Sequence, residues 1–482
     1  MKQTRIVWLL GVIIAIALTG CGGAAVASSA EPPVSALEQA SAEAEPEITP
    51  EPATEEGAVS SVAESTEEIE GEASVTDERT AEPLPEPSEP APWTDHLLSA
   101  RTVTKVFGDG QKIASVALEY DAAIDSATVD PADYTVADQE VTGAYVSDHA
   151  GLVSESTSGS LVIVTVNTGY ENELVGGIGN PNSVSNQLAA SVSQIGDIAD
   201  EAGSQFLGND TVLDTDYTET INLVVDDFQQ LVFSNPEDGS ELMYNLFVPE
   251  NTDEALPLVL FMPDATGSGT DPVKTLTQGL GAVVWAEPDS QAENPCYVLA
   301  PQYTNQPTDA ANTLSLLDYV VEHYNVDANR LYTTGQSAGT IKSIQFMIDN
   351  PDLFAAALLV AGQAENGYEE RIGELAGQNL WMVCSTGDAR ANPGMTAIME
   401  AVEAEGTEVT TGQWSCLIPQ EEQNAEAAKM EEAGTSINFT VLSEVVPDGM
   451  SDSAVAEHLC TWRVAYSIPE IRNWVFRQRR NG

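Results

Sequence analysis

The chain has 482 residues, of which 42% are hydrophobic, and its 76 acidic residues against 17 basic ones give a formal net charge of -59. This length exceeds what one hydrophobic core usually organises, so we expect two folded units together with non-globular segments. The negative charge repels phosphate backbones and anionic lipid headgroups, which argues against nucleic-acid binding and against electrostatic docking to membranes.

The start of the chain resembles a bacterial export signal. Lys2 and Arg5 precede an almost unbroken apolar run, 6–18, which is too short to span a bilayer comfortably as a helix. The run ends in the sequence LTGC, which resembles a lipobox, and this resemblance implies cleavage before Cys21 and attachment of diacylglycerol to its sulfur. We predict a lipoprotein signal peptide at 1–20 and an exported protein that contacts a membrane only through its lipid. The alternative is an ordinary signal peptide or a short membrane anchor.

The next segment, 21–92, consists mainly of Ala, Ser, Thr, Glu and Pro. It holds too little apolar surface to offset the entropy of ordering, and its like charges repel one another. We predict a disordered acidic tether. No motif supports the alternative of a specific binding segment.

From Trp93 the sequence changes to short β-branched runs separated by Gly, Asp, Asn and Pro. Such spacing is typical of a small antiparallel sandwich, which we place at 93–228. The stretch 176–216 is expected to be loop, followed by an edge strand at 221–225. The other predicted strands in this part are 101–107, 113–120, 133–136 and 161–166.

After about residue 226, buried strands alternate with helical patterns, and we assign 229–482 to one α/β domain. This alternation predicts right-handed crossovers and a mostly parallel sheet covered on both faces, with the site at the carboxyl ends of its strands. The predicted strands are 242–248, 256–262, 297–300, 330–334, 355–360, 380–384 and 437–442. The predicted helices are 311–324, 338–350, 393–405 and 420–432.

A nucleophile elbow is predicted at Ser337. The sequence GQSAG follows an apolar strand and precedes a helix with apolar residues on one face. A strained strand-to-helix turn leaves no room for side chains two residues before and after the nucleophile, which explains the glycines at 335 and 339. The turn exposes the hydroxyl and directs it at the amino end of the helix.

A serine hydroxyl needs a base, and histidine is the usual one because its pKa lies near neutrality. In this fold the chain order is nucleophile, acid, histidine. Of four histidines only His458 follows Ser337. We expect a loop after the last strand to carry His458 over the sheet.

The acid is expected after the strand 380–384, which runs into Asp388. There a carboxylate would accept the imidazole N–H, fix the tautomer and stabilise the imidazolium. Asp448 and Asp452, just before the histidine, are the competing acids. The oxyanion needs two backbone N–H donors, and we predict Ala338 and, after the strand 256–262, Ala265.

Four cysteines follow Cys21, and none shows metal-ligand spacing, so we expect no metal and no cofactor. Export permits disulfides, but four cysteines allow three pairings, and each is as well explained as a small buried hydrophobe. They are Cys296, Cys384, Cys416 and Cys460.

Together these segments resemble one family: exported bacterial esterases and peptidases related to polyhydroxyalkanoate depolymerases and prolyl oligopeptidase-like hydrolases, with an immunoglobulin-like domain before an α/β-hydrolase domain. The resemblance covers about residues 100–479 and implies a triad of Ser337, Asp388 and His458. It rests on TVTKVFGDGQ, YNLFVPENTDEALPLVLFMP, CYVLAPQ, the elbow, GDARANPGM and HLCTWRVAYSIPEIRNWVF. One departure is Pro263, which stands where family members commonly carry histidine. Asp264 beside it could oppose an oxyanion if it points inward.

We therefore predict a serine hydrolase that cleaves neutral carboxylic esters through an acyl-enzyme. Peptides are the alternative substrate within the same chemistry. A catalytically silent surface lipoprotein that binds a glycan or polymer is the alternative from another class.

Overall fold

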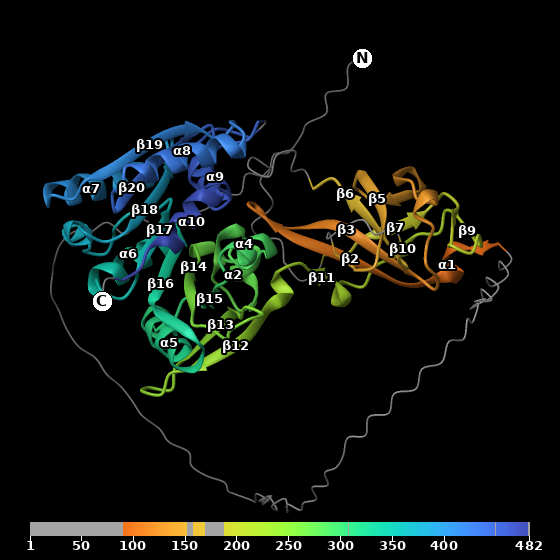
Figure 1. Cartoon of the computed structure of the whole chain (residues 1–482), viewed down its shortest axis with the longest axis horizontal. Helices are drawn as coiled ribbons and strands as arrows, with labels where there is room; N and C mark the ends of the chain where they lie inside the picture. Colours follow the sequence, from red (N-terminus) through yellow and green to blue (C-terminus); the bar gives the residue numbers. More distant parts are fainter. Residues whose placement is uncertain (1–89, 152–157, 169–187, 307, 449, 481–482) are drawn as a thin grey trace, which may run out of the picture. The chain divides into compact units, whose positions relative to one another are not determined.

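The computed structural model describes residues 90–151, 158–168, 188–306, 308–448 and 450–480 (Figure 1). The predicted signal peptide, nearly all of the predicted tether and Cys21 lie outside the described residues. No helix formed within these ranges is long and apolar enough to cross a membrane.

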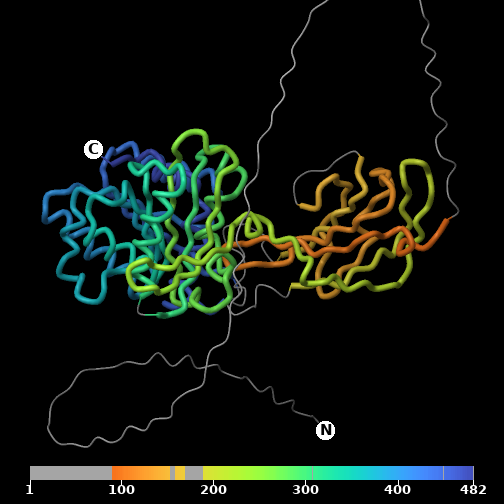
Figure 2. The backbone as a smooth tube through the Cα atoms, turned by 90° about the horizontal axis from the view of Figure 1, so that it is seen from below, coloured from red at the N-terminus to blue at the C-terminus, as the bar shows by residue number. Residues whose placement is uncertain are grey.

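The described residues between 90 and 222 form strands and short turns, as the sequence predicts, and Figure 2 traces them in colours from orange to yellow-green. Their largest sheet has the strand order β11-β2-β3-β6-β5, and two three-stranded sheets have the orders β10-β7-β4 and β1-β9-β8. The elements are β1 (Ala91–Pro92), α1 (Trp93–His96), β2 (Leu97–Phe107), β3 (Gly110–Tyr120), β4 (Tyr134–Val136), β5 (Val141–Ser147), β6 (Leu161–Val166), β7 (Ser191–Gln194), β8 (Ile198–Ala199), β9 (Gln205–Leu207), β10 (Leu213–Asp214) and β11 (Ile221–Asn222).

A core of its own holds this β part together. Trp93 and Leu118 are fully buried in it, and Tyr120 is 1% exposed. The Tyr120 hydroxyl donates to the Gln194 side-chain oxygen at 2.6 Å, which connects β3 to β7. This bond satisfies two buried polar groups that would otherwise destabilise the core.

Two sequence predictions for this part were wrong. The stretch 176–216 is not all loop, because its described residues include β7, β8, β9 and β10. These strands have two to four residues, too few to show a period-2 pattern. The predicted strand 221–225 ends after Asn222, and a 3₁₀ turn, Val225–Asp227, follows.

The remaining residues form a nine-stranded sheet with the order β12-β13-β15-β14-β16-β17-β18-β20-β19. Only β13 runs against the other strands, so the prediction of a mostly parallel sheet is confirmed. The strands are β12 (Phe228–Ser234), β13 (Glu241–Phe247), β14 (Leu256–Met262), β15 (Tyr297–Gln302), β16 (Val326–Gln336), β17 (Ala356–Val360), β18 (Leu380–Ser385), β19 (Val409–Ser415) and β20 (Ile437–Ser443).

The helices are α2 (Lys274–Thr277), α3 (Leu280–Val283), α4 (Pro288–Glu293), α5 (Asp309–His323), α6 (Ala338–Asp349), α7 (Ala391–Ala404), α8 (Gln420–Glu432), α9 (Ala454–Ala465) and α10 (Pro469–Arg477). The four predicted helices correspond to α5, α6, α7 and α8. No helix was predicted at α2, α3, α4, α9 or α10, and no strand at the edge strands β12 and β19. The domain boundary that we placed between 228 and 229 falls at the first residue of β12 and stays a prediction.

Helices cover both faces of this sheet (Figure 1). Successive residues of a strand point to opposite faces. On β16, Tyr332 packs edge-on against Phe476 of α10, whereas Thr333 is hydrogen-bonded to Ser343 of α6. Helices α6 and α10 therefore lie on opposite faces of the sheet.

Candidate active site

The elbow at Ser337 joins a strand to a helix through a strained backbone conformation. Ser337 lies between β16 and α6 with φ 52° and ψ −115°, a positive φ that a residue with a side chain rarely adopts. Its N–H donates to the carbonyl oxygen of Val360 on β17 at 3.0 Å. The neighbouring Thr340 hydroxyl lies 2.7 Å from the carbonyl oxygens of both Gly335 and Val360. These bonds fix a conformation that the serine would not hold alone.

The two elbow glycines are required by space. A Cβ on Gly339 would lie 1.9 Å from the carbonyl oxygen of Met262, the last residue of β14. A Cβ on Gly335 would lie 2.5 Å from the carbonyl carbon of Gly339. Glycine is therefore needed at positions 335 and 339 because the first turn of α6 lies so close to β14 and β16.

The structure brings together the three side chains predicted from the sequence. Ser337 Oγ lies 2.9 Å from His458 Nε2, and His458 Nδ1 lies 2.6 Å from Asp388 Oδ2. The histidine side chain is 23% exposed and the aspartate side chain 2% exposed. The competing acids Asp448 and Asp452 are not the partners of the imidazole.

Asp388 is held as an ionised acceptor. Burial raises the pKa of the Asp388 carboxyl, but hydrogen bonds from His458 and from the backbone N–H groups of Ala391 and Arg390 outweigh burial and leave the pKa below its usual value. The two N–H groups donate to Oδ1 at 2.9 and 3.0 Å, which leaves Oδ2 for the imidazole. The acid is therefore charged and oriented at neutral pH.

His458 comes from a helix and not from a loop, which corrects the sequence prediction. Helix α9 begins at Ala454, and the Ser453 side chain caps it by accepting from the N–H of Ala456. His458 packs edge-on against Trp462 one turn later, with ring centroids 5.2 Å apart. Most side chains of α9 are buried, so the helix shows no amphipathic pattern in the sequence.

The two N–H groups that the sequence predicts as oxyanion donors are those of Ala338 and Ala265. Ala338 is the first residue of α6, where a helix has no acceptor for its N–H, and the helix dipole favours negative charge there. Ala265 is the first residue of the 3₁₀ turn Ala265–Gly267 after β14. The next two N–H groups, of Thr266 and Gly267, are bonded to the side chain and the carbonyl of Asp264. The N–H of Ala265 is therefore the one that the turn leaves open.

Pro263 and Asp264 are both buried, and the Asp264 carboxylate is bonded to Thr266 and to Gln336. Sequence reasoning missed Gln336, because the second residue of a G-x-S-x-G motif carries no fixed identity.

The four cysteines that could have formed disulfides are free and buried. Burial raises the pKa of Cys296 to about 12, and it also raises the pKa of the other three thiols. Within the described ranges there is no cluster of three or more His, Cys, Asp or Glu side chains that could hold a metal ion.

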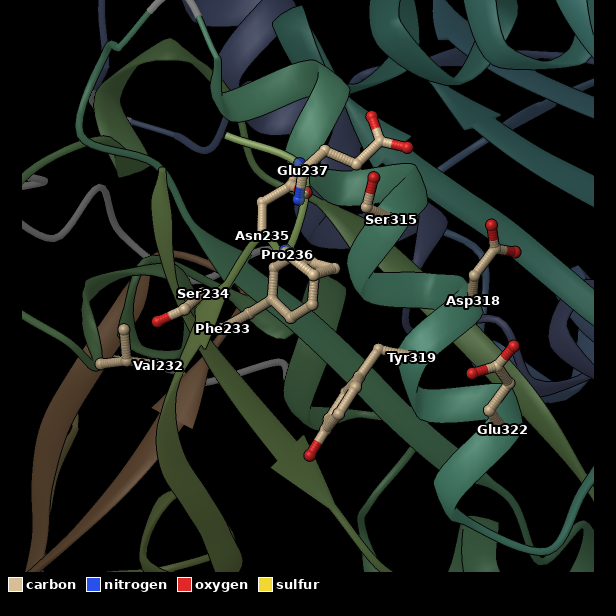
Figure 3. A pocket seen from close by; sticks show the side chains of 10 residues that line it. All are labelled: Val232, Phe233, Ser234, Asn235, Pro236, Glu237, Ser315, Asp318, Tyr319 and Glu322. Atoms are coloured by element: carbon tan, nitrogen blue, oxygen red, sulfur yellow. Dashed lines mark hydrogen bonds between the residues drawn. The ribbon is translucent and has the colours of Figure 1, made fainter. Parts of the chain in front are cut away.

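A groove of about 690 Å³ lies elsewhere, between the free edge of β12 and α5 (Figure 3). Phe233 and Tyr319 pack against each other in it, and Glu237, Asp318 and Glu322 add negative charge. None of the three clustered side chains described above lines it, so its size does not identify it as the reactive site.

The β part matches a known domain family. A family model described as "Esterase Ig-like N-terminal domain" matches residues 99–207. The chain is also similar to acetylxylan esterase A of Aspergillus awamori, with 25% identity over 31% of this chain and 50% of the relative. Acetylxylan esterase A of Emericella nidulans is 28% identical over 25% of this chain and 41% of the relative. The chain spans about half the length, or less, of these curated relatives.

Among solved structures, one described as a thermostable esterase superposes with a TM-score of 0.61 and 24% identity, covering 80% of this chain and all of the other. A solved acetyl xylan esterase from Aspergillus awamori gives a TM-score of 0.28 at 15% identity over 38% of this chain. The first superposition confirms the predicted α/β-hydrolase fold, and the family model confirms the immunoglobulin-like β domain before it. The chain is therefore similar, in both its fold and its N-terminal β domain, to esterases.

Proposed function

We propose that this chain is an exported serine hydrolase that cleaves carboxylic esters. The observation that carries the proposal is the continuous hydrogen-bonded series from Ser337 Oγ through His458 to Asp388, at 2.9 and 2.6 Å, on a strained elbow. This arrangement has the three roles that nucleophilic acyl transfer requires: nucleophile, base and orienting acid.

In the first half-reaction Ser337 Oγ attacks the ester carbonyl carbon while His458 Nε2 takes the hydroxyl proton. The imidazolium that forms is stabilised by the Asp388 carboxylate, and the negative oxygen of the tetrahedral intermediate accepts hydrogen bonds from the N–H groups of Ala265 and Ala338. The bond to the leaving alcohol then breaks, and the alcohol departs with the proton from His458. In the second half-reaction, water attacks the acyl-enzyme by the same proton transfers in reverse, releasing the acid and free Ser337.

The relatives favour small acyl groups on carbohydrate alcohols as the substrate class, because the curated ones are named acetylxylan esterases. A neutral substrate also suits a chain of net charge -59. Export and lipid attachment at Cys21 remain part of the proposal, on the strength of the sequence of the first residues.

The test is hydrolysis of p-nitrophenyl acetate and of a peptide p-nitroanilide by the full chain, by Ser337→Ala and by Ser315→Ala. Ser315 is a partly buried serine on α5 that lines the groove of Figure 3, so it controls for loss of a hydroxyl away from the triad. Ester turnover that disappears only in Ser337→Ala supports the proposal. Anilide turnover with the same dependence would indicate a peptidase. Wild type that is inert on these two substrates and also on acetylated xylan would favour the silent binding protein.

A further inference from the structure

Asp264 is a buried carboxylate next to the proposed oxyanion site. It is 5% exposed, and it follows directly on β14 and Pro263. The donors to its carboxylate are neutral groups: the backbone N–H and the hydroxyl of Thr266 and the side-chain amide of Gln336. A buried charge of this kind is costly unless its hydrogen bonds are satisfied, so the arrangement calls for a physical reason.

The carboxylate connects the two halves of the oxyanion site. Asp264 Oδ1 accepts from the N–H and the hydroxyl of Thr266, both at 2.6 Å, and Thr266 follows Ala265 in the 3₁₀ turn. Asp264 Oδ2 accepts from Gln336 Nε2 at 2.9 Å, and Gln336 precedes Ser337 at the elbow. One side chain therefore joins the turn that carries one N–H donor to the elbow that carries the nucleophile and the other donor.

Gln336 depends on this bond in turn. It is fully buried, and its Oε1 has no hydrogen-bond partner among the described residues. It occupies space that a glycine leaves, because a Cβ on Gly281 would lie 3.1 Å from Gln336 Oε1. Its bond to Asp264 is thus the polar contact that holds the amide, and the two buried groups fix each other's position.

We propose that Asp264, acting through Gln336 and Thr266, is a positioning residue that sets the placement of the Ala265 N–H relative to Ser337 and Ala338. This inference rests on the proposed serine hydrolase function and deepens it. Preorganised donors stabilise a tetrahedral intermediate only when they are held where its charge develops. Asp264 does not touch the substrate; it keeps the oxyanion turn and the elbow at a fixed separation.

The first test is Asp264→Ala in the full chain, assayed with p-nitrophenyl acetate. We expect kcat to fall by about tenfold to a hundredfold, because removing one oxyanion donor altogether costs about 10²–10³. KM should change by less than about threefold, since the affected interaction is made in the transition state. Inhibition by phenylboronic acid should weaken by the same factor as kcat/KM, because its boron bonds to Ser337 Oγ and becomes tetrahedral while the proton passes to His458.

Gln336→Ala should cause a similar loss, and the double variant Asp264→Ala/Gln336→Ala should lose no more than the worse single variant, since one contact is removed twice. Asp264→Asn should recover part of the rate that Asp264→Ala loses. The new side chain keeps an Oδ1 that accepts from Thr266, and its Nδ2 can donate to Oε1 of Gln336 once the Gln336 amide has rotated. This conservative variant also serves if Asp264→Ala fails to fold.

Asp309→Ala is the matched control. Asp309 is a 4% exposed carboxylate whose Oδ2 accepts from the N–H groups of Thr304 and Gln306, so it supports a loop after β15 in the same manner. We expect this variant to lose thermal stability while kcat stays within about twofold. An equal fall in kcat for Asp309→Ala and Asp264→Ala would overturn the proposal, because the effect would then be general destabilisation.

Two other outcomes would overturn it. Unchanged kcat and unchanged boronate inhibition in Asp264→Ala would mean that the turn keeps its position without the carboxylate. If Asp264→Asn had a higher kcat than the wild type, the negative charge of Asp264 would oppose the oxyanion instead of positioning its donors. Activity that survives in Ser337→Ala is a separate result, because it would refute the serine hydrolase function itself.

Discussion

Gly339→Ala should lower both the activity and the thermal stability of the protein, because the added Cβ would collide with backbone. The added Cβ would lie 1.9 Å from the carbonyl oxygen of Met262, although real Cβ contacts below 3.0 Å essentially do not occur. Relief requires a movement of about 1 Å between the first turn of α6 and the end of β14, and both partners are backbone, so no side-chain rotation can supply it. Forced overpacking of this kind typically costs about 1–3 kcal/mol.

The same movement changes the distance between the elbow and the oxyanion turn, because Met262 precedes Pro263 and the turn at Ala265–Gly267. Misplacement by about 1 Å can lower a rate by about 10²-fold. We therefore expect kcat/KM for p-nitrophenyl acetate to fall by about that factor, with a lower midpoint of thermal unfolding. The assay pairs initial-rate kinetics with thermal unfolding followed by circular dichroism.

Gly373→Ala is the control, because its Cβ would meet Glu405 Cγ at an ordinary 3.4 Å and Gly373 lies in the 3₁₀ turn Ile372–Leu375, away from the triad. It should leave both quantities unchanged within error. If Gly339→Ala kept kcat/KM within about threefold and unfolded at the wild-type temperature, the inferred close approach of α6 to β14 would be wrong.

Further predictions concern the acid and the thiols. Asp388→Asn should lower kcat by about 10³–10⁴, because the imidazole loses the partner that sets its tautomer, and retention of more than a tenth of the activity would assign that role elsewhere. The pKa of Asp388 in the folded state lies below its unfolded value, so its ionised form stabilises the folded state above about pH 4 and this contribution is lost as the pH falls through the folded pKa. The difference between the urea-unfolding midpoints of wild type and Asp388→Asn should therefore become smaller as the pH is lowered from 6 to 3. A difference that stays constant would contradict the lowered pKa of Asp388. The four buried thiols should react with Ellman's reagent only after unfolding in urea without reductant, whereas a disulfide would leave two of them unreactive. They are Cys296, Cys384, Cys416 and Cys460.

The ends of strands and helices were predicted most accurately where the burial of their residues is uniform or periodic. The buried strand β14 and the helix α6 were both placed within a residue of their ends. A strand covered on both faces reads as a continuous apolar run, and a helix between surface and core shows a repeating apolar face. These patterns depend only on local neighbours, which a single sequence displays.

Most of the elements that were missed lack such a pattern. The exception is α10, whose buried residues Ile471, Trp474 and Val475 do recur at helical spacing. β12 and β19 are edge strands with several exposed polar residues, and their pairing is decided by the neighbouring strand. Helix α9 is buried around most of its circumference, so it shows no apolar stripe, and the prediction placed His458 in a loop. The chain order of nucleophile, acid and histidine nevertheless identified His458, because order is independent of the local conformation.

The buried contacts around the oxyanion turn could not be predicted, since they join residues far apart in the sequence. Nothing in the pattern near Gln336 indicates that its amide meets Asp264, a residue 72 positions earlier. From the sequence alone Asp264 could oppose an oxyanion, but in the structure its two carboxylate oxygens are already bonded to Thr266 and Gln336.

Contacts of the next residue also explain why proline is tolerated at position 263, where family members commonly carry histidine. Proline has no N–H, so it cannot be an oxyanion donor itself, and its ring limits the backbone at the point where β14 ends. The carboxylate of Asp264 caps the following 3₁₀ turn at the N–H of Thr266, and the carbonyl of Asp264 accepts from Gly267. Because these bonds use the second and third N–H groups of the turn, the first, of Ala265, is left available for the oxyanion role that we propose for it. A side chain at position 263 is therefore not needed to shape this turn, since the next residue supplies the hydrogen bonds that determine its geometry.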